Sequence, residues 1–325
     1  MTTTETRAAG DGTIAEITED GDPADLIGRR VDRLNTASLR KVIEPDTDVA
    51  GALGPGQVFS SQLSVAADLD LGLTDEQKVK LSREEMASVV VAGIRFEAIL
   101  MSGFAEQVAH ADNIVDPRIV YMLHEIGEET RHSRLFLRLV EQLAPTAKSP
   151  ADDGIANFLF RHVTRFVIHR PTALCVLVLA GEEIPDLIQK KLVEHPDTDP
   201  FLKSVNRYHR QEEARHLAYA RMVLPELWEE ASWVDRFTVR HLLPVVIRTM
   251  FDWLVHPGVF ETVGLPGRAT WRAVAKSRHQ TDIRHQAIRP VLAALVTPGV
   301  IPAGQVSRGW RRLCGVDRFG QPVGN

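Results

Sequence analysis

The stretch from residue 206 to residue 219, NRYHRQEEARHLAY, decides both the fold and the site of this chain. It contains no Pro or Gly, so a helix is expected across it. His209, Glu213 and His216 are spaced by four and three residues and therefore share one face of that helix. Two imidazoles and a carboxylate on one face are arranged as metal ligands need to be.

A near-copy of this motif lies upstream. Glu125, Glu129 and His132 have the same spacing, and every position of the second copy follows the first by 84 residues (209 − 125, 213 − 129 and 216 − 132). A single Glu-x-x-His is common by chance and is most simply read as surface charge on a helix. Two copies in register are hard to obtain by accident, and they predict a metal site.

Each copy is preceded by a Glu in an apolar helical run. Glu97 lies 32 residues before Glu129, and Glu182 lies 31 residues before Glu213. Two Glu from two helices and a Glu-x-x-His from each of two others form the dinuclear carboxylate site of ferritin-like bundles. No alternating strand pattern is present. The chain is therefore predicted to be all-α, with a ferritin-like four-helix-bundle core and additional helices.

The candidate ligands are four Glu and three His that these motifs place together. Glu129 and Glu213 are the expected bridges, because each carboxylate offers one oxygen to either metal. Nitrogen and oxygen ligation without thiolate suits iron or manganese better than structural zinc or copper. Two iron ions are the expected cofactor, and manganese fits the same ligands. The full set is Glu97, Glu129, His132, Glu182, His209, Glu213 and His216.

Three positions leave alternatives. Glu182 is preferred over Glu183, because the repeat offset (97 + 85) and an apolar stripe favour it. Glu128 is set aside, because Glu129 is the residue three positions before His132. His209 is a third imidazole beyond the common two-His set, and it is expected to give the second metal an extra nitrogen ligand and so to make the site asymmetric. Its alternative reading is an outer-sphere or surface His.

At these positions the sequence resembles the diiron arylamine N-oxygenases, which include enzymes of aureothin and chloramphenicol biosynthesis. That family has the order Glu, ExxH, Glu, HxxxExxH, and every position is matched here. The resemblance covers roughly residues 80–300. It implies a ferritin-like core in which a diferrous site reacts with O2 to give a peroxo-diferric oxidant. It also implies oxidation of an aryl-amine nitrogen through hydroxylamine and nitroso stages to nitro, in secondary-metabolite biosynthesis.

Other functions fit the same ligands. One alternative is a different diiron oxygenase: a C-hydroxylase, a desaturase, or an N-oxygenase that stops before nitro. Another is an iron-handling ferroxidase or store, and a third is a helical scaffold with a vestigial site. No GxGxxG or P-loop is present, so the electrons are expected from an external donor. A homodimer is expected, as is common among ferritin-like oxygenases.

Bulk properties limit the partners. The 325 residues carry a net charge of −5, which predicts binding neither to nucleic acid nor to an anionic membrane. The two Cys cannot build a disulfide framework. The start of the chain is acidic and lacks the basic and apolar regions of a signal peptide. A reduced cytoplasm is the expected location.

The predicted organisation is a disordered tail over residues 1–25, one ferritin-like domain over 26–315 and a loose tail over 316–325. Residues 26–60 are expected to form short pieces. Ser82 and Asp116 are expected to cap the first two long helices. Pro185 is expected to kink its helix or remove one backbone hydrogen bond. The helices are expected at 83–109, 117–143, 154–169, 171–194, 200–230, 233–255 and 268–297.

Further polar residues flank the predicted ligand helices. Asp186, one turn after Glu182, is a candidate to orient a ligating imidazole. The tyrosines are candidates for hydrogen bonds near the metals or for packing alone. A basic stretch near the C-terminus is either a solvated face or a cation for a substrate carboxylate. These residues are Tyr121, Tyr208, Tyr219, Arg278, Arg284, His285 and Arg289.

Overall fold

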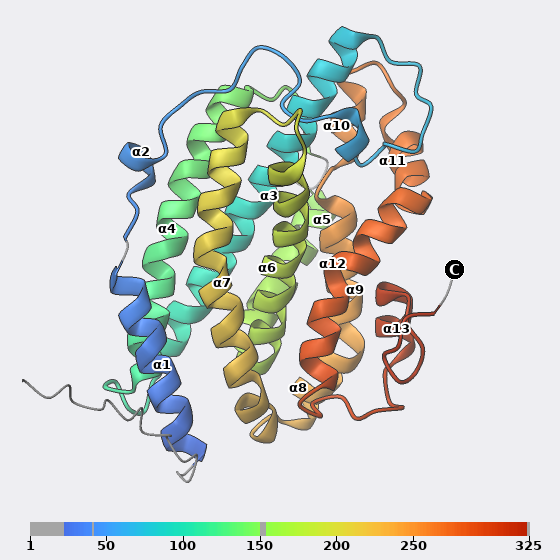
Figure 1. The fold of residues 1–325 in the computed structure, drawn as a ribbon. Helices are drawn as coiled ribbons and strands as arrows, with labels where there is room; N and C mark the ends of the chain where they lie inside the picture. Colours follow the sequence, from blue (N-terminus) through green and yellow to red (C-terminus); the bar gives the residue numbers. More distant parts are fainter. Residues whose placement is uncertain (1–22, 41, 150–153, 324–325) are drawn as a thin grey trace, which may run out of the picture.

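The computed structural model describes residues 23–40, 42–149 and 154–323, and this part of the chain is helical with no strand. Four long helices lie side by side: α3 (Asp75–Ala109), α4 (Pro117–Leu143), α6 (Pro171–Glu194) and α7 (Pro200–Glu229) (Figure 1). α3 packs against α4, and α6 packs against α7. Helix α5 (Gly154–Ile168) carries the chain back along the bundle between α4 and α6. This is a four-helix bundle with one long crossover, as in ferritin-like folds, and the all-α prediction is confirmed.

The first long helix begins earlier than the sequence pattern indicated. Thr74 Oγ1 accepts a hydrogen bond from the Gln77 amide, and Gln77 Oε1 accepts one from the Thr74 amide. This reciprocal capping box fixes the start of α3. Ser82, which was predicted to cap the helix, lies inside it, and its hydroxyl accepts from the Val58 amide instead. The prediction for Ser82 was therefore wrong.

The other ligand helices begin and end close to the predicted residues. Asp116 caps α4 by accepting from the Arg118 amide, as predicted. Asp199 caps α7 in the same way. Both helices begin with Pro at the first position, where its fixed φ and missing N–H cost nothing. α6 continues through Pro185 to Glu194.

The segment expected as one helix over 233–255 is divided into three. α8 (Trp233–Phe237) leads into a π-helical turn, η2 (Thr238–Leu242), and then into α9 (Leu243–Trp253). Pro244 cannot donate to the carbonyl of Arg240. That carbonyl accepts from Ser307 Oγ, and the carbonyl of Val239 accepts from Trp310 Nε1. Ser307 caps α13 (Arg308–Cys314), so a contact with a distant segment takes up the carbonyls freed by the π turn.

The helix expected over 268–297 is also two helices, α11 (Gly267–Lys276) and α12 (Arg278–Val296). Ser277 separates them with an extended backbone, and its Oγ accepts from the Gln280 amide. A serine at this point acts as an N-cap that begins a new helix. The short helix α10 (Pro257–Glu261) precedes this pair.

The ends of the chain differ in part from the prediction. Residues 1–22 of the predicted N-terminal tail lie outside the described residues. Helix α1 (Pro23–Arg40) occupies much of the stretch expected as short pieces, and it lies along α4 and α7. Short turns do follow, in α2 (Pro45–Asp48) and η1 (Ser61–Leu63). Near the other end, the described part of the predicted loose tail contains an antiparallel bridge between Val316 and Pro322, and Val316 is buried.

The apolar interior of the bundle is divided in two. One cluster contains Leu100, Ile119 and Leu224 and extends to α9, α12 and α13. The other contains Met86, Leu135 and other residues toward the opposite end of the bundle. The candidate ligands occupy the helical turns between these clusters. Their burial between two apolar layers removes bulk water from them, which strengthens electrostatic interactions there.

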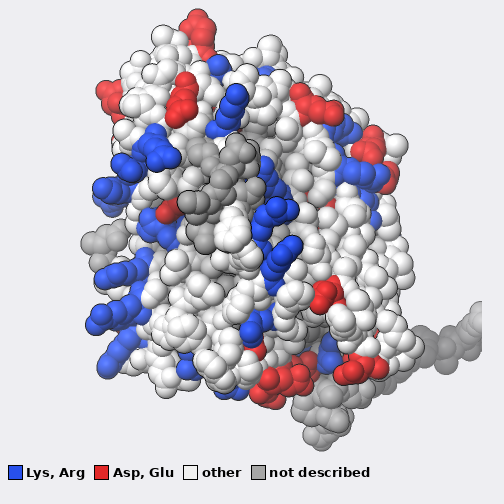
Figure 2. Space-filling view, turned by 180° about the vertical axis from the view of Figure 1, so that it is seen from behind, with Lys and Arg blue, Asp and Glu red and all other residues white. Residues whose placement is uncertain are grey.

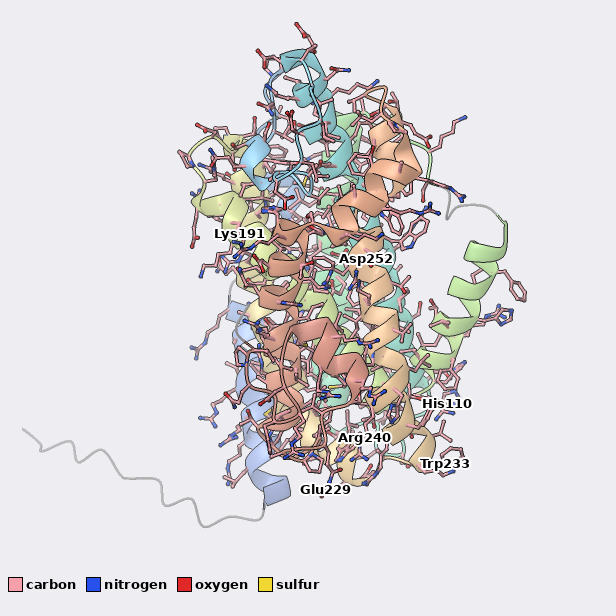
Figure 3. All side chains as sticks on the ribbon, turned by 90° about the vertical axis from the view of Figure 1, so that its right-hand side faces the viewer. His110, Lys191, Glu229, Trp233, Arg240 and Asp252 are labelled. Atoms are coloured by element: carbon pink, nitrogen blue, oxygen red, sulfur yellow. The ribbon has the colours of Figure 1, made fainter. Side chains whose placement is uncertain are left out.

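The remaining helices cover the outside of the bundle. α12 packs against α6, and α5 lies on the outer side of the bundle in Figure 3. On the face shown in Figure 2, basic side chains gather along the left edge and down the middle, and acidic ones lie mainly at the top, right and bottom, so no single charge covers it. By length and composition alone, α3 could cross a membrane, and residues 161–168 with α6 pass that test only together as a bent pair. Core helices of soluble bundles pass the same test.

Candidate metal centre

The structure brings all seven predicted ligand residues together in the middle of the bundle, and all seven are buried. Their nitrogen and oxygen atoms form two neighbouring groups, and the atoms within each group lie within 4.8 Å of one another. Each of the four long helices contributes. One group contains Glu97, His132 and His209, and the other contains Glu129, Glu182, Glu213 and His216.

Glu129 and Glu213 lie between the two imidazoles contributed by the Glu-x-x-His motifs. Glu129 presents Oε2 to His132 Nδ1 at 3.3 Å and Oε1 to His216 Nδ1 at 3.3 Å. Glu213 presents Oε1 to His132 Nδ1 at 3.1 Å and Oε2 to His216 Nδ1 at 2.8 Å. Each carboxylate therefore spans the two sides of the site. This is the arrangement that bridging ligands of two metals require.

Two of these oxygens test whether a metal fits. Glu129 Oε1 and Glu213 Oε1 are buried and accept no hydrogen bond from any described residue, although imidazole nitrogens lie close by. Buried oxygens without a donor are costly. Donor atoms that approach one another without hydrogen bonding can instead converge on a shared cation. Carboxylate and imidazole donors without thiolate suit iron or manganese, so the residues present fit such a metal pair.

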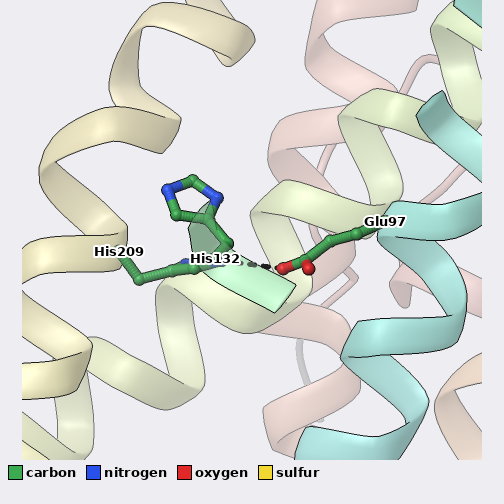
Figure 4. Close-up of side chains that lie close together, drawn as sticks. All are labelled: Glu97, His132 and His209. Carbon is green, nitrogen blue, oxygen red and sulfur yellow. Dashed lines mark hydrogen bonds and ion pairs between the residues drawn. The ribbon is translucent and has the colours of Figure 1, made fainter. Parts of the chain in front are cut away.

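His209 lies on the His132 side of the site, so the expectation that it serves the second metal, beside His216, is wrong. Nε2 of His209 is 3.4 Å from Glu97 Oε1 and 3.3 Å from Glu213 Oε1, and its ring centroid lies 4.5 Å from that of His132 (Figure 4). Its other nitrogen, Nδ1, donates to Gln189 Oε1 at 3.1 Å. The amide oxygen thus fixes the ring orientation and turns Nε2 toward the carboxylates. The alternative reading of His209 as a surface residue does not apply.

An outer pair of carboxylates orients the other two imidazoles, and the sequence reading missed their role. His132 Nε2 donates to Glu212 Oε2 at 3.0 Å, and His216 Nε2 donates to Glu128 Oε2 at 2.9 Å. Each repeat therefore supplies the carboxylate that orients the imidazole of the other repeat. Such contacts fix the tautomer and raise the basicity of a ligating imidazole. The signal was present in the sequence, because these carboxylates share the repeat offset (128 + 84 = 212).

Two arginines and a tyrosine complete this outer ring. Arg215 Nη2 lies 2.8 Å from Glu128 Oε1, and Arg131 Nη2 lies 3.7 Å from Glu212 Oε1. The arginines also share the repeat offset (131 + 84 = 215). Tyr208 Oη donates to Glu212 Oε2 at 3.0 Å. The guanidinium groups balance the outer carboxylates, which leaves the inner carboxylates for a cation of another kind.

The inner groups have displaced pKa values. Burial raises the pKa of Glu97 and of Glu182. Burial also opposes ionisation of Glu213, but the charges of His216 and His209 outweigh it and hold the pKa of Glu213 well below its ordinary value. Burial disfavours protonation of His132, but its hydrogen bonds to Glu129 and Glu212 and the nearby charge of Glu213 raise its pKa well above the ordinary value. A metal must therefore displace protons to bind.

Several other candidates from the sequence lie elsewhere. Glu183 pairs with Arg221 rather than with the inner groups, which leaves Glu182 as the residue facing the site. Asp186 pairs with Arg210 at 2.6 Å and orients no imidazole among the described residues. The candidate role of Asp186 is therefore not borne out, because its side chain pairs with Arg210 away from the imidazoles.

The aromatic and basic candidates have separate positions. Tyr121 stacks on Tyr219 with ring centroids 4.1 Å apart. Within α12, Arg284 is buried, and burial lowers its pKa to about 10. Arg289 donates to the carbonyl of Cys314. The basic stretch is thus not a uniform solvated face.

Comparison with known proteins assigns the family. Residues 68–299 match the family described as p-aminobenzoate N-oxygenase AurF. The match covers most of the chain and all seven candidate ligands. The chain belongs to the p-aminobenzoate N-oxygenase AurF family, which is a family of diiron oxygenases.

Two uncharacterized mycobacterial proteins are similar to part of this chain. The uncharacterized proteins Mb0909 of Mycobacterium bovis and Rv0885 of Mycobacterium tuberculosis are each 28% identical to this chain over 183 residues. The match covers 56% of this chain and 53% of either relative. The chain therefore matches only about half the length of these relatives.

Proposed function

We propose that this protein is a two-iron oxygenase that uses O2 to oxidise the nitrogen of an aromatic amine through hydroxylamine and nitroso stages to nitro. The observation that carries the proposal is the pair of carboxylates that each face both motif imidazoles in a buried cluster. The family of the chain supports an oxygenase of this class. When bound, the two iron ions supply the reductive activation of O2.

The positions of the donor atoms support one assignment of the ligands. Glu129 and Glu213 would bridge the two metals. The first metal would lie beside the two imidazoles that face Glu97, and the second would lie beside the imidazole that faces Glu182. The terminal ligands would be Glu97, His132 and His209 for the first metal and Glu182 and His216 for the second.

The residues around these ligands hold the site rigid and dry. Ser133 Oγ donates to Glu97 Oε2 at 2.6 Å, and Gln189 fixes the third imidazole. The outer carboxylates hold His132 and His216 in the orientation that directs Nδ1 inward. Such preorganisation keeps ligands in place while the oxidation state of a metal changes. The apolar clusters at both ends of the site exclude bulk water.

The partners and the setting of the reaction are part of the proposal. The electrons would come from a separate donor, and the protein would act as a cytoplasmic homodimer in a biosynthetic pathway that produces nitro-aromatic compounds. Manganese in place of one or both iron ions is compatible with the donors. The expected low-molecular-weight partners are an arylamine and O2.

The proposal is tested by reconstituting the protein with Fe(II) under anaerobic conditions and then adding O2 with p-aminobenzoate or another aniline. The expected result is a change in visible absorption whose decay is faster with the amine present, together with a nitro product by mass spectrometry. A signal that is indifferent to every aniline would contradict the amine substrate. Catalytic Fe(II) oxidation with release of iron would indicate a ferroxidase instead.

A further inference from the structure

One buried carboxylate beside the metal centre has no partner. Glu125 is 1% exposed, and neither of its oxygens accepts a hydrogen bond from any described residue. Across the described ranges, no Lys, Arg or His nitrogen forms an ion pair with it. The neighbouring hydroxyl of Tyr121 is buried and also makes no hydrogen bond. A carboxylate in this environment is costly unless something cationic or a donor compensates it.

The repeat places Glu125 at the position that His209 occupies in the second copy (125 + 84 = 209). His209 projects from α7 toward the side of the site that contains His132 and Glu97. The two repeats exchange roles across the site, because the outer carboxylate of each contacts the imidazole of the other. By the same exchange, Glu125 on α4 would face the side that contains His216, although its oxygens do not belong to the group of donor atoms that lie within 4.8 Å of one another there.

The electrostatic surroundings of Glu125 agree with this placement. Among its main charged neighbours, only the imidazole of His216 favours ionisation, and Glu128, Glu129 and Glu213 oppose it. The arginines of the outer ring form ion pairs with Glu128 and Glu212. Glu125 therefore interacts electrostatically with His216, and no cation of the described residues forms an ion pair with it.

We infer that Glu125 is an eighth metal ligand and binds the second metal. Its role there would correspond to that of His209, its counterpart in the other repeat, at the first metal. This inference rests on the proposed two-metal site. The two metals would then have different donor sets. The first would receive two imidazoles and one terminal carboxylate, and the second would receive one imidazole and two terminal carboxylates. The harder, oxygen-rich second position would favour metals that prefer oxygen donors.

The test compares metal binding in the wild type with that in Glu125→Gln. Gln conserves the shape but lacks the anionic oxygen. Anaerobic titration with Mn(II), followed by calorimetry and metal analysis, is expected to show two ions bound by the wild type. In Glu125→Gln, the affinity for one of the two should fall roughly 10- to 100-fold, at least the loss that outer-sphere changes cause. The other affinity should be unchanged.

Two further variants and one spectroscopic measurement make the outcome decisive. Glu125→His restores a donor that matches the other repeat and should recover two-ion binding. Glu85→Gln removes another buried carboxylate on the bundle, one that contacts Ser64 and Val65 rather than the site, and should bind like the wild type. Co(II)-loaded Glu125→Gln should absorb visible light more strongly than the Co(II)-loaded wild type, because one ion would lose a ligand.

The failure of this inference differs from the failure of the proposed function. If Glu125→Gln binds two ions with wild-type affinities and an unchanged Co(II) spectrum, Glu125 is not a ligand and the seven-residue site remains. If the wild type binds no stoichiometric metal, both the site and this inference are wrong.

Discussion

The half of the site built by α3 and α4 and the half built by α6 and α7 are closely related in sequence and position, and they differ most at one place. Inner Glu, outer Glu, Arg and His recur at matching positions, but Glu125 corresponds to His209. A smaller difference follows, since Ser133, which donates to Glu97, corresponds to Leu217 (133 + 84). The comparison teaches that the repeat sets where donors lie, whereas single substitutions set how the two metal positions differ.

Removing a bridging carboxylate should abolish metal binding in both halves of the site at once. Glu129 and Glu213 each face both motif imidazoles, so Glu129→Gln or Glu213→Gln should reduce bound iron from two ions to fewer than one per chain and eliminate oxygenase activity. Metal analysis of the reconstituted variants checks this, with circular dichroism as the control for folding. Two ions retained in either variant would show that these carboxylates do not bridge.

The outer carboxylates should affect opposite halves. Glu212→Gln should lower the affinity for the metal beside His132, and Glu128→Gln should lower the affinity for the metal beside His216, each roughly 10- to 100-fold. Crystals prepared at limiting Mn(II) would reveal which position empties in each variant. The crossed arrangement is wrong if both variants empty the same position.

Gln189 contacts a candidate ligand in one half of the site only. Its removal should therefore increase the difference in metal affinity between the two halves. Gln189→Leu frees the His209 ring by removing the oxygen that accepts from Nδ1. We expect a loss of about tenfold or less in affinity, confined to the first metal. Stepwise titration with Mn(II) measures both affinities, and an equal loss at both positions would contradict the account.

A buried carboxylate outside the site should affect stability and leave metal binding unchanged. Burial raises the pKa of Glu85 from 4.5 to about 7. The protonated Glu85 therefore contributes its full stability below its pKa in the unfolded chain. This contribution is lost as the pH rises through its pKa in the folded protein, and the free energy of unfolding falls by ~3 kcal/mol. Glu85→Gln should match the wild type at pH 4 and exceed its free energy of unfolding by ~3 kcal/mol at pH 8.

Urea unfolding of the metal-free proteins at both pH values measures that difference. A wild type whose stability relative to Glu85→Gln does not change with pH would show that this carboxyl is not held protonated.

The sequence predicted the ligand helices and the residues that meet between them, because the ligand spacing and the helical period follow from local rules. It also contained the outer ring, since Glu128 and Glu212 obey the same offset as the inner motif. Gln189 could not be found this way, because it has no counterpart in the first repeat and its role depends on how α6 faces α7.

The positions at which helices begin or break were harder to predict, because some of them depend on residues far away in the sequence. The start of α3 was encoded in Thr74 and Gln77, a capping pair that a search beginning at the apolar run overlooks. The π turn before Pro244 is different, because the carbonyls it frees accept from Ser307 and Trp310. Those donors are more than sixty residues away in sequence. No local pattern shows such a contact.

The most direct test of the central claim is an anomalous-scattering map of the iron-loaded protein, recorded on both sides of the iron absorption edge. The account predicts two iron peaks roughly 3.5–4 Å apart, one beside Glu97, His132 and His209 and the other beside Glu182 and His216. A single peak, or iron bound away from the carboxylates that face both motif imidazoles, would contradict it.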